Sequence, residues 1–249
     1  MKDISTQEVR EHVKRTNPWW NGEIGAGVRR IKGLRPRLYL DLLYPLVSDT
    51  SINRAVVLLG PRRVGKTYLI FHLIERLISD GVNPKNIGYL DVEHPILHYQ
   101  SLEAMVSFLE ESAQPGETHY IFFDEIQYLR DWELHLKSMV DIRPDLRILV
   151  SGSAAAALKR QSQESGAGRF TDFMLPPLTF PEFITLLDKD GLLSVRNGSL
   201  YHVPDYAELN DAFVDYLNHG GYPELALSER AREDKEGSFS NCVGRRFHA

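Results

Sequence analysis

The feature that most constrains this chain is the eight-residue segment Gly60–Thr67, which reads Gly-Pro-Arg-Arg-Val-Gly-Lys-Thr. It fits the pattern G-x-x-x-x-G-K-[S/T], in which the backbone curls so that its N–H groups converge on a phosphate. An apolar run, Ala55–Leu59, precedes the segment, and an amphipathic stretch, Tyr68–Ile78, follows it. Because a buried strand leads through a tight turn into a helix N-terminus, the segment predicts a loop that binds a nucleoside triphosphate.

This phosphate-binding loop, or Walker A motif, also predicts how the nucleotide is held. Lys66 would reach the β- and γ-phosphates and act in catalysis, and the Thr67 hydroxyl group would coordinate Mg²⁺. ATP is favoured over GTP because the sequence contains no Asn-Lys-x-Asp motif for reading guanine. The predicted nucleotide-binding residues are Gly60, Pro61, Arg62, Arg63, Val64, Gly65, Lys66, Thr67 and Tyr68.

Two adjacent carboxylates, Asp124 and Glu125, follow a second apolar run, Tyr120–Phe123. A buried strand that carries an acid at its C-terminal end is a Walker B pattern. Asp124 would hold Mg²⁺ together with Thr67, directly or through water. Glu125 comes one residue later, where a carboxylate can polarise the water that attacks the γ-phosphate. The acid pair favours hydrolysis over nucleotide binding alone, and an ordinary turn at a strand edge is the alternative.

A third apolar run, Leu146–Val150, ends in Ser151-Gly152-Ser153. In additional-strand P-loop ATPases, the strand beside the Walker B strand ends in a polar sensor residue that contacts the γ-phosphate or the attacking water. Ser153 is a catalytic candidate on this ground, and Ser151 is an alternative that the spacing leaves open. Ser153 is equally suited to cap the N-terminus of a helix over 154–160.

Apolar runs and amphipathic segments alternate along the central part of the chain. Strands are expected at 55–59, 87–91, 120–123, 146–151 and 170–175, and helices at 66–79, 102–111, 132–140 and 154–160. Such alternation is typical of a parallel sheet with helices on both faces, whose ligands bind beyond the carboxyl ends of the strands. We therefore predict an α/β fold, a P-loop NTPase three-layer sandwich with a five-stranded parallel sheet.

Composition narrows the class of protein further. The 249 residues suffice for one sizeable α/β domain and a smaller appendage. A net charge of −5 argues against a dedicated nucleic-acid coat, and the single cysteine, Cys242, excludes an internal disulfide bond and fits a reducing compartment. No apolar stretch approaches the length of about 18 residues that spans a membrane, and the N-terminus lacks a signal-peptide core. We expect a soluble, cytoplasmic protein that does not contact membranes.

Residues 1–50 are expected to form an N-terminal helical arm. Thr6–Arg15 predicts a short charged helix that ends at Asn17-Pro18, and a further helix is expected over 38–46. Between them, Trp19 and Trp20 lie in a loop that looks exposed. Packing of these two rings onto the core is favoured over binding of a ligand.

Five cations lie within nine residues of this arm, namely Arg29, Arg30, Lys32, Arg35 and Arg37. One interpretation is a solvated face. The other is a contact with the phosphates of a nucleotide or a nucleic acid.

The ATPase core is expected to span 51–188 and a C-terminal region 189–249. Thr179 and Glu182 have the spacing of a capping box that begins a helix through about Leu187. A helix is expected over 207–217, followed by a loop over 218–224 and a charged, glycine-broken tail. We predict that this small, partly helical region is a lid or the truncated start of a second domain.

The chain resembles prokaryotic AAA-type ATP-binding proteins related to the archaeal ATPase and STAND groups. The segments that match are GPRRVGKT, FFDEIQ, SGS, Gly168-Arg169-Phe170, Leu178-Thr179-Phe180-x-Glu182-Phe183 and Gly220-Gly221-Tyr222-Pro223-Glu224. The resemblance implies ATP and Mg²⁺ as cofactors and a sheet in which the Walker B strand is not adjacent to the P-loop strand. It also implies a second domain, often of winged-helix character, most of which we expect to be missing because the sequence ends at Ala249.

The resemblance further places an arginine at Arg169. It follows the flexible Gly166-Ala167-Gly168 and precedes a strand, so its guanidinium is expected near the ligand edge of the sheet. An always-charged group suits the charge that grows on the γ-phosphate during transfer. Such an arginine finger acts in its own chain or in a neighbouring copy, which makes a homo-oligomer one implied partner. A surface ion pair is the alternative.

The leading hypothesis is a slow, Mg²⁺-dependent ATPase that couples ATP binding and hydrolysis to conformational change. A regulatory switch, in which the nucleotide state controls a partner protein, is the first alternative. The second is a DNA-associated AAA-type motor that contacts nucleic acid through the basic N-terminal segment. A partner could also be bound through the missing C-terminal region.

Overall fold

The computed structural model describes residues 5–22, 31–153, 168–196 and 200–228. The chain divides into two compact units. The first, here called the sheet unit, comprises Met1–Gly33, Tyr39–Gly60 and Lys66–Leu175. The second unit comprises Leu34–Leu38, Pro61–Gly65 and Pro176–Ala249, so it takes in the five residues that join the P-loop strand to its helix. The domain boundaries expected from the sequence stay a prediction.

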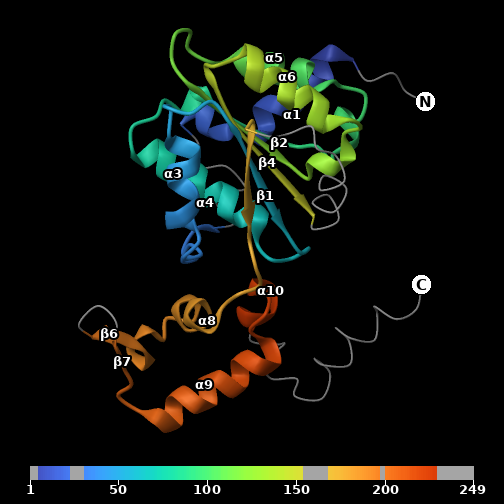
Figure 1. Cartoon of the computed structure of the whole chain (residues 1–249). Helices are drawn as coiled ribbons and strands as arrows, with labels where there is room; N and C mark the ends of the chain where they lie inside the picture. The colour runs from blue at the N-terminus through green and yellow to red at the C-terminus, as the bar shows by residue number, and fades with distance from the viewer. Residues whose placement is uncertain (1–4, 23–30, 154–167, 197–199, 229–249) are drawn as a thin grey trace. The chain divides into compact units, whose positions relative to one another are not determined.

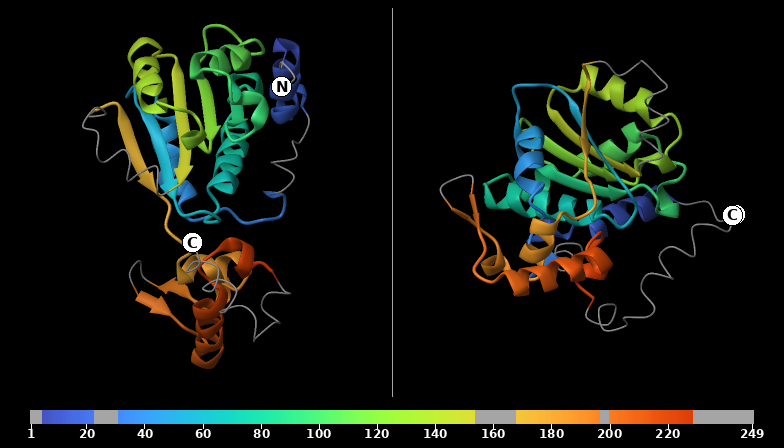
Figure 2. Two further views of the ribbon diagram at one scale, coloured as in Figure 1. Left: turned by 90° about the vertical axis from the view of Figure 1, so that its right-hand side faces the viewer. Right: turned by 60° about the horizontal axis from the view of Figure 1, so that its bottom comes forward.

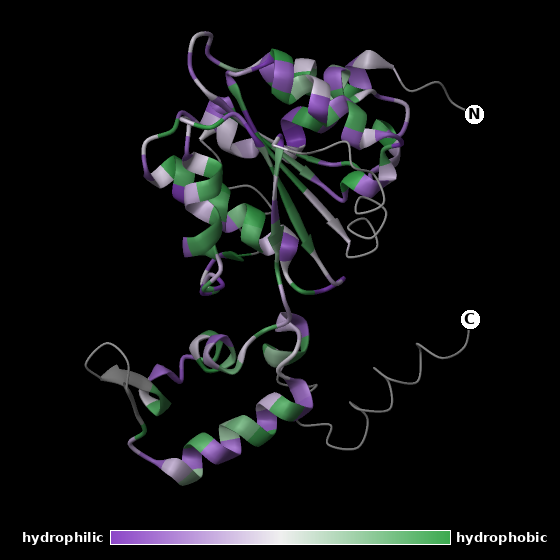
Figure 3. Cartoon of the chain, in the orientation of Figure 1, coloured by the Kyte–Doolittle hydropathy of each residue, from purple (hydrophilic) through white to green (hydrophobic). Residues whose placement is uncertain are grey.

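The sheet unit is built on the five-stranded parallel sheet that the sequence predicts (Figure 2). Its strands are β1 (Ala55–Gly60), β2 (Ile87–Asp91), β3 (His119–Asp124), β4 (Leu146–Ser153) and β5 (Phe170–Met174). Their order across the sheet is β2-β3-β4-β1-β5, so β4 separates the Walker B strand β3 from the P-loop strand β1. The central strands are strongly apolar (Figure 3), and β1 is buried at every residue. This is the pattern of parallel strands that are covered on both faces.

Helices flank this sheet on both sides (Figure 1). α3 and α4 pack together on one face, α5 and α6 pack together on the other, and α1 lies beside the edge strand β2. The helices are α1 (Thr6–Thr16), α3 (Leu40–Ser48), α4 (Lys66–Ser79), α5 (Leu102–Glu110) and α6 (Trp132–Ile142), and the short 3₁₀ turns are η1 (Pro18–Asn21), η2 (Pro84–Asn86), η3 (Pro95–Leu97) and η4 (Ile126–Tyr128). The helix expected over 154–160 lies outside the described residues. In the described part of the chain, no helix is both long enough and apolar enough to cross a membrane.

The N-terminal arm is fastened to the outer edge of β2. The indole N–H groups of Trp19 and Trp20 both donate to the carbonyl oxygen of Ile87, at 2.9 and 2.8 Å. The side chain of Asn17 accepts from the N–H of Tyr89 at 2.6 Å and donates to its carbonyl oxygen at 2.9 Å. These contacts satisfy backbone groups that an edge strand would otherwise leave unpaired. The tryptophans are buried, so the exposed-looking loop was a wrong expectation and packing onto the core is confirmed.

The second unit has a small apolar core of its own. Its elements are α8 (Phe180–Leu186), η6 (Asp190–Leu192), the hairpin strands β6 (Ser194–Arg196) and β7 (Leu200–His202), α9 (Tyr206–His219) and α10 (Pro223–Ala226). The core residues are Leu178, Phe183, Ile184, Leu192, Ala212 and Ala226. Tyr216 packs against the rings of Phe180 and Phe183, and its hydroxyl group donates to the carbonyl oxygen of Leu178 at 2.8 Å.

One expectation for this unit needs correction, and one of its elements was not expected. The segment 218–224 is not a continuous loop, because α9 continues to His219 and α10 begins at Pro223. The β6–β7 hairpin was not expected from the sequence. The capping box is confirmed, since Thr179 and Glu182 cap α8 reciprocally. The tail beyond residue 228 lies outside the described residues.

Candidate active site

The carboxyl ends of β2, β3 and β4 bring three polar residues together at one edge of the sheet. Asp91 and Asp124 are direct partners in the parallel register of β2 and β3. On the other side of β3, Phe123 pairs with Val150, which places Ser151 next to Asp124. Sequence spacing predicted that strand ends would meet at this edge, and the register decides which residues become neighbours.

Asp124 is the centre of this edge and is only 2 % exposed. Its Oδ2 accepts from the hydroxyl group of Thr67 at 2.6 Å and from that of Tyr89 at 3.2 Å. Its Oδ1 accepts from the hydroxyl group of Ser151. The threonine of the predicted Walker A motif and the aspartate of the predicted Walker B motif therefore meet, although they lie on elements far apart in the sequence. A threonine hydroxyl and a carboxylate are hard oxygen donors of the kind that Mg²⁺ prefers.

Lys66 lies at the start of α4, where the helix N-terminus adds positive potential. The side chain is buried, and its ammonium group donates to the carbonyl oxygen of Gly60 at 3.1 Å. The contact folds the cation back over the end of β1. An ammonium group bonds a charged phosphate oxygen more strongly than a neutral carbonyl, so an arriving phosphate can take the place of this acceptor.

The turn 61–65, part of the predicted phosphate-binding loop, contains two residues with positive φ. Gly65 has a φ of 97°, in the left-handed region that glycine adopts at little cost. Arg63 also has a positive φ, of 65°, which is uncommon for a residue with a side chain. Strained torsions of this kind persist where the surrounding structure fixes them, and they concentrate at functional sites.

Glu125 adopts a left-handed conformation as well, with φ 54°. Its backbone N–H donates to the hydroxyl oxygen of Ser151 at 3.2 Å, and its carboxylate accepts from the side-chain amide of Gln127. The oxygen of that amide accepts from the backbone N–H of Ser153 at 3.3 Å. Gln127 thus links the predicted catalytic carboxylate to one of the two candidate sensor serines.

The two serines have different surroundings. Ser151 is fully buried and contacts both Asp124 and the backbone of Glu125 through its hydroxyl group. Ser153 is partly exposed and is tied to Gln127 through its backbone. The structure therefore gives a side-chain contact with the acid pair to Ser151, the alternative that the spacing left open, and not to Ser153, the catalytic candidate. The alternative helix-cap role of Ser153 concerns residues outside the described part.

Three residues of this site were missed by sequence reasoning. Asp91 ends a predicted strand, which was a usable signal, and Gln127 stands within the FFDEIQ string. Tyr89 gave no signal, because only the register turns its hydroxyl group toward Asp124. Burial raises the pKa of Asp91, and the nearby carboxylates of Asp124, Glu93 and Glu125 raise it further. This edge concentrates negative charge that a bound cation would relieve.

Arg169 does not lie at the ligand edge of the sheet, where the sequence predicted it. Its carbonyl oxygen accepts from the N–H of Ala55 at 3.0 Å, at the start of β1, so it lies at the amino edge of the sheet. Strands of this length separate the two edges by about 20 Å. The guanidinium forms an ion pair with Asp141 at 2.6 Å. The expected position near the ligand edge is wrong, and the surface ion pair that was the alternative is what the structure shows.

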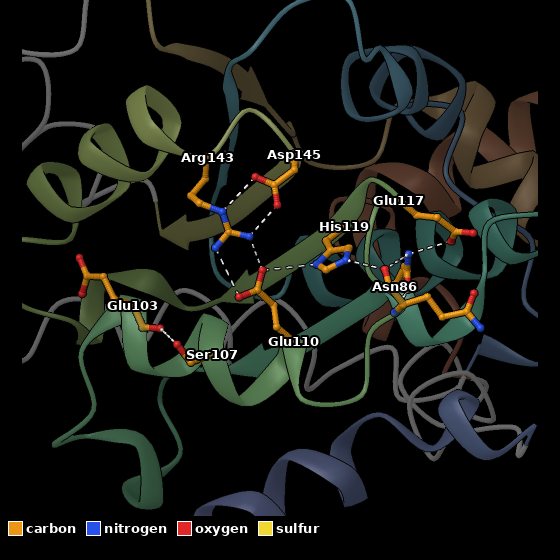
Figure 4. A network of polar contacts seen from close by, with 9 residues as sticks. Asn86, Glu103, Ser107, Glu110, Glu117, His119, Arg143 and Asp145 are labelled. Atoms are coloured by element: carbon orange, nitrogen blue, oxygen red, sulfur yellow. Dashed lines mark hydrogen bonds and ion pairs between the residues drawn. The ribbon is translucent and has the colours of Figure 1, made fainter.

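A second cluster of polar groups lies at the same amino edge (Figure 4). Among the described residues, Glu110, His119 and Asp145 are the one set of histidine and acidic side chains whose ligand atoms lie within 4.8 Å of one another. Arg143 donates to Asp145 at 2.6 Å and to Glu110 at 3.3 Å. Hydrogen bonds to Asp145 and Glu110 raise the pKa of Arg143. Because the guanidinium of Arg143 already pairs with both carboxylates of this set, we interpret the cluster as an ion-pair network.

The basic cluster of the N-terminal arm is also not one solvated face. Arg29 and Arg30 lie outside the described residues, and Lys32 is exposed. Arg35 forms ion pairs with Asp188, at 2.7 Å, and with Asp190. Arg37 is buried and paired with Glu182. The solvated-face interpretation is therefore wrong for Arg37.

Comparisons with known proteins identify the family of this chain. A family model described as an AAA domain matches residues 52–184. An uncharacterised protein of Methanocaldococcus jannaschii is 28% identical over 184 residues, covering 74% of this chain and 39% of that protein. An uncharacterised protein of Haemophilus influenzae is 25% identical over 210 residues, covering 82% of this chain and 48% of that protein. The chain spans less than half the length of these two relatives.

Solved structures share the fold. A structure titled as an Hsp104–casein complex from S. cerevisiae has a TM-score of 0.54 and 16% identity, covering 88% of this chain and 40% of that one. A structure of the Orc1 protein of Aeropyrum pernix in complex with DNA has a TM-score of 0.51 and 12% identity, covering 78% of this chain and 58% of that one. At these identities the likeness establishes the fold alone.

Proposed function

Since this chain belongs to the AAA domain family over residues 52–184, we propose that it binds ATP and hydrolyses it in a Mg²⁺-dependent reaction coupled to conformational change. The observation that carries the proposal is the 2.6 Å contact between the hydroxyl group of Thr67 and the carboxylate of Asp124. Asp124 ends β3 and Thr67 lies in the helix that follows β1, and β4 separates these two strands, yet the oxygens of the two residues converge as a metal site requires.

Each residue has a separate task in this proposal. Thr67 and Asp124 would hold Mg²⁺, which supplies positive charge to the phosphate oxygens when it is bound. Lys66 would exchange the carbonyl oxygen of Gly60 for a phosphate oxygen. Catalysis then depends mainly on positioning and on electrostatic stabilisation of the transferred group.

Glu125 is the proposed catalytic carboxylate. Its strained backbone, the N–H contact with Ser151 and the amide of Gln127 restrict where the carboxylate can point. A carboxylate held in this way can orient the attacking water and accept its proton. We propose that Ser151 and Ser153 assist as sensor residues, with Gln127 joining Ser153 to the catalytic acid.

The central experiment is steady-state ATP hydrolysis with and without Mg²⁺ in the wild type and in Glu125→Gln. The variant should retain ATP binding and lose turnover by roughly 10²–10⁴-fold, because only the activation of water is removed. Glu75→Gln, an exposed carboxylate on α4, is the matched control and should hydrolyse ATP at the wild-type rate. Equal turnover in Glu125→Gln and the wild type would sink the assignment.

Coupling to a partner is the other half of the proposal. The nucleotide-controlled switch predicts that a partner changes the affinity for ATP, with turnover incidental. The DNA-associated motor draws on the likeness to the DNA complex of Orc1, but Arg35 is paired with acids and Arg37 is buried, which leaves less of the basic segment for phosphates. ATPase rates with and without duplex DNA over a salt series separate the two, since DNA stimulation must fall as salt rises.

A further inference from the structure

A buried arginine of the N-terminal segment, Arg37, donates a hydrogen bond to the backbone of the proposed phosphate-binding loop. The side chain of Arg37 is 5 % exposed, and its Nη1 donates to the carbonyl oxygen of Val64 at 2.9 Å and to that of Pro176 at 3.1 Å. Val64 is the residue before Gly65 of the loop, and all of these residues belong to the second unit. A charged donor on a backbone carbonyl makes a stronger contact than a neutral one.

The charge of Arg37 is neutralised where it lies. Its Nε and Nη2 donate to the two carboxylate oxygens of Glu182, each at 2.8 Å. The side chain of Glu182 is 1 % exposed, and its Oε2 also accepts from the backbone N–H and the hydroxyl group of Thr179, at 3.1 Å each. A bidentate pair in this geometry fixes the plane of the guanidinium. The guanidinium of Arg37 is therefore held in one orientation by Glu182 and is not available to bind a phosphate directly.

The contact with Val64 sets the direction of a backbone donor. In a trans peptide the carbonyl and the following N–H point in opposite directions, and the chain contains no cis peptide among its described residues. If Arg37 holds the carbonyl oxygen of Val64, the N–H of Gly65 must point away from Arg37. A phosphate-binding loop needs its N–H groups turned toward the anion and its carbonyl groups turned outward.

We propose that Arg37, held by Glu182, is a positioning residue that aims the Gly65 N–H of the phosphate-binding loop. This inference rests on the proposed ATP binding and adds to it how the Gly65 N–H is oriented. The first helix of the second unit, α8, carries Glu182, so a change in that helix would reach the loop through one ion pair. Arg37 acts on the nucleotide only through the backbone of the loop.

The test separates positioning from simple structural support. Arg37→Met leaves a buried carboxylate unpaired and is expected to destabilise the protein. The double variant Arg37→Met/Glu182→Met removes the pair together, and replacing a buried ion pair by apolar side chains is often neutral for stability. Arg35→Met, an exposed arginine two residues away, is the matched control.

Two readouts apply to the double variant once its Tm matches the wild type. Amide hydrogen exchange of a peptide covering 60–67, measured without nucleotide, should be about tenfold faster than in the wild type and in Arg35→Met. The KM for ATP should rise about tenfold while kcat changes less than about threefold, because the acid pair is untouched. Arg37→Lys should fall between, since one ammonium cannot replace the planar fork.

The outcomes distinguish the two claims. Unchanged exchange over 60–67 in a folded double variant overturns the positioning role, whatever ATP does. Faster exchange with an unchanged KM for ATP also overturns the positioning role, because the loop then binds ATP equally well without Arg37. A wild-type protein that binds no ATP overturns the proposed function. The hydrogen-exchange result still tests whether Arg37 positions the loop.

Discussion

At the amino edge of the sheet, Glu110 and Asp145 share the guanidinium of Arg143, whereas at the carboxyl edge Asp91 and Asp124 lie side by side in register. The hydrogen bond from Arg143 lowers the pKa of Asp145. Burial and neighbouring carboxylates raise the pKa of Asp91. Both edges gather acids: at the amino edge a guanidinium pairs with them, and at the carboxyl edge the closely spaced carboxylates would favour a bound cation. This difference separates a structural network from a candidate ligand site better than the presence of acidic residues does.

The largest effect that we expect at the carboxyl edge is the loss of ATP affinity in Lys66→Ala. Removing the only ammonium group of the phosphate-binding loop should weaken ATP affinity by at least about 100-fold, or about 2.7 kcal/mol, because a charge-assisted contact with phosphate is lost. Isothermal titration with ATP measures the change. Lys137→Ala, on α6, is the control for loss of a lysine, and ATP-dependent thermal stabilisation that survives in Lys66→Ala would remove the loop assignment.

The amino edge should respond in the opposite way to loss of its cation. Arg143→Met leaves Glu110 and Asp145 without their shared counterion and should lower Tm by about 3–5 °C. ATP affinity should stay within about twofold of the wild type, because this edge lies about 20 Å from the carboxyl edge. Arg130→Met, at a side chain that is 94% exposed, is the control and should leave Tm unchanged. A loss of ATP affinity in Arg143→Met would show that the two edges are not independent.

The pH dependence of stability tests the contrast further, because replacing Asp91 and replacing Asp145 should change Tm in opposite directions. The raised pKa of Asp91 means that its ionised form disfavours the folded state, so Asp91→Asn should raise Tm at pH 7. The lowered pKa of Asp145 means that its ionised form favours the folded state, so Asp145→Asn should lower Tm at pH 7. The difference for Asp91→Asn should shrink as the pH falls from the raised pKa toward the ordinary aspartate value of about 3.9. The difference for Asp145→Asn should persist down to about that value and shrink as the pH falls further, through the lowered pKa. Thermal melts of the two variants without nucleotide, from pH 7 to pH 3, check the signs, and equal signs would refute the comparison.

Arg169→Ala should have the smallest effect on catalysis. Because Arg169 pairs with Asp141 at the amino edge, turnover per chain at low protein concentration should change by less than about twofold. A large defect that does not depend on protein concentration would contradict this placement. A defect that appears only as concentration rises would instead support a finger supplied to a neighbouring copy.

The sequence determined the fold class, the strand positions and most of the candidate site. The loop motif, the apolar runs and the acid pair are local signals, since each depends on residue types at short spacing. Their convergence could also be expected, because parallel strands end at a common edge, and the structure brings Thr67 and Asp124 into contact there. The sequence could also have predicted the place of Arg169, since a residue directly before a parallel strand lies at the amino edge of the sheet. The expected place near the ligand edge was wrong because Arg169 precedes β5 and parallel strands begin at the edge opposite the ligand.

The tertiary structure alone decided the remaining residues, because register and long-range pairing leave no local trace. Tyr89 and Ser151 reach Asp124 through the alignment of neighbouring strands. Arg37 looks like one cation in a solvated cluster until its partner, 145 residues away in sequence, buries it. Burial of a charge depends on a partner that only the folded chain supplies.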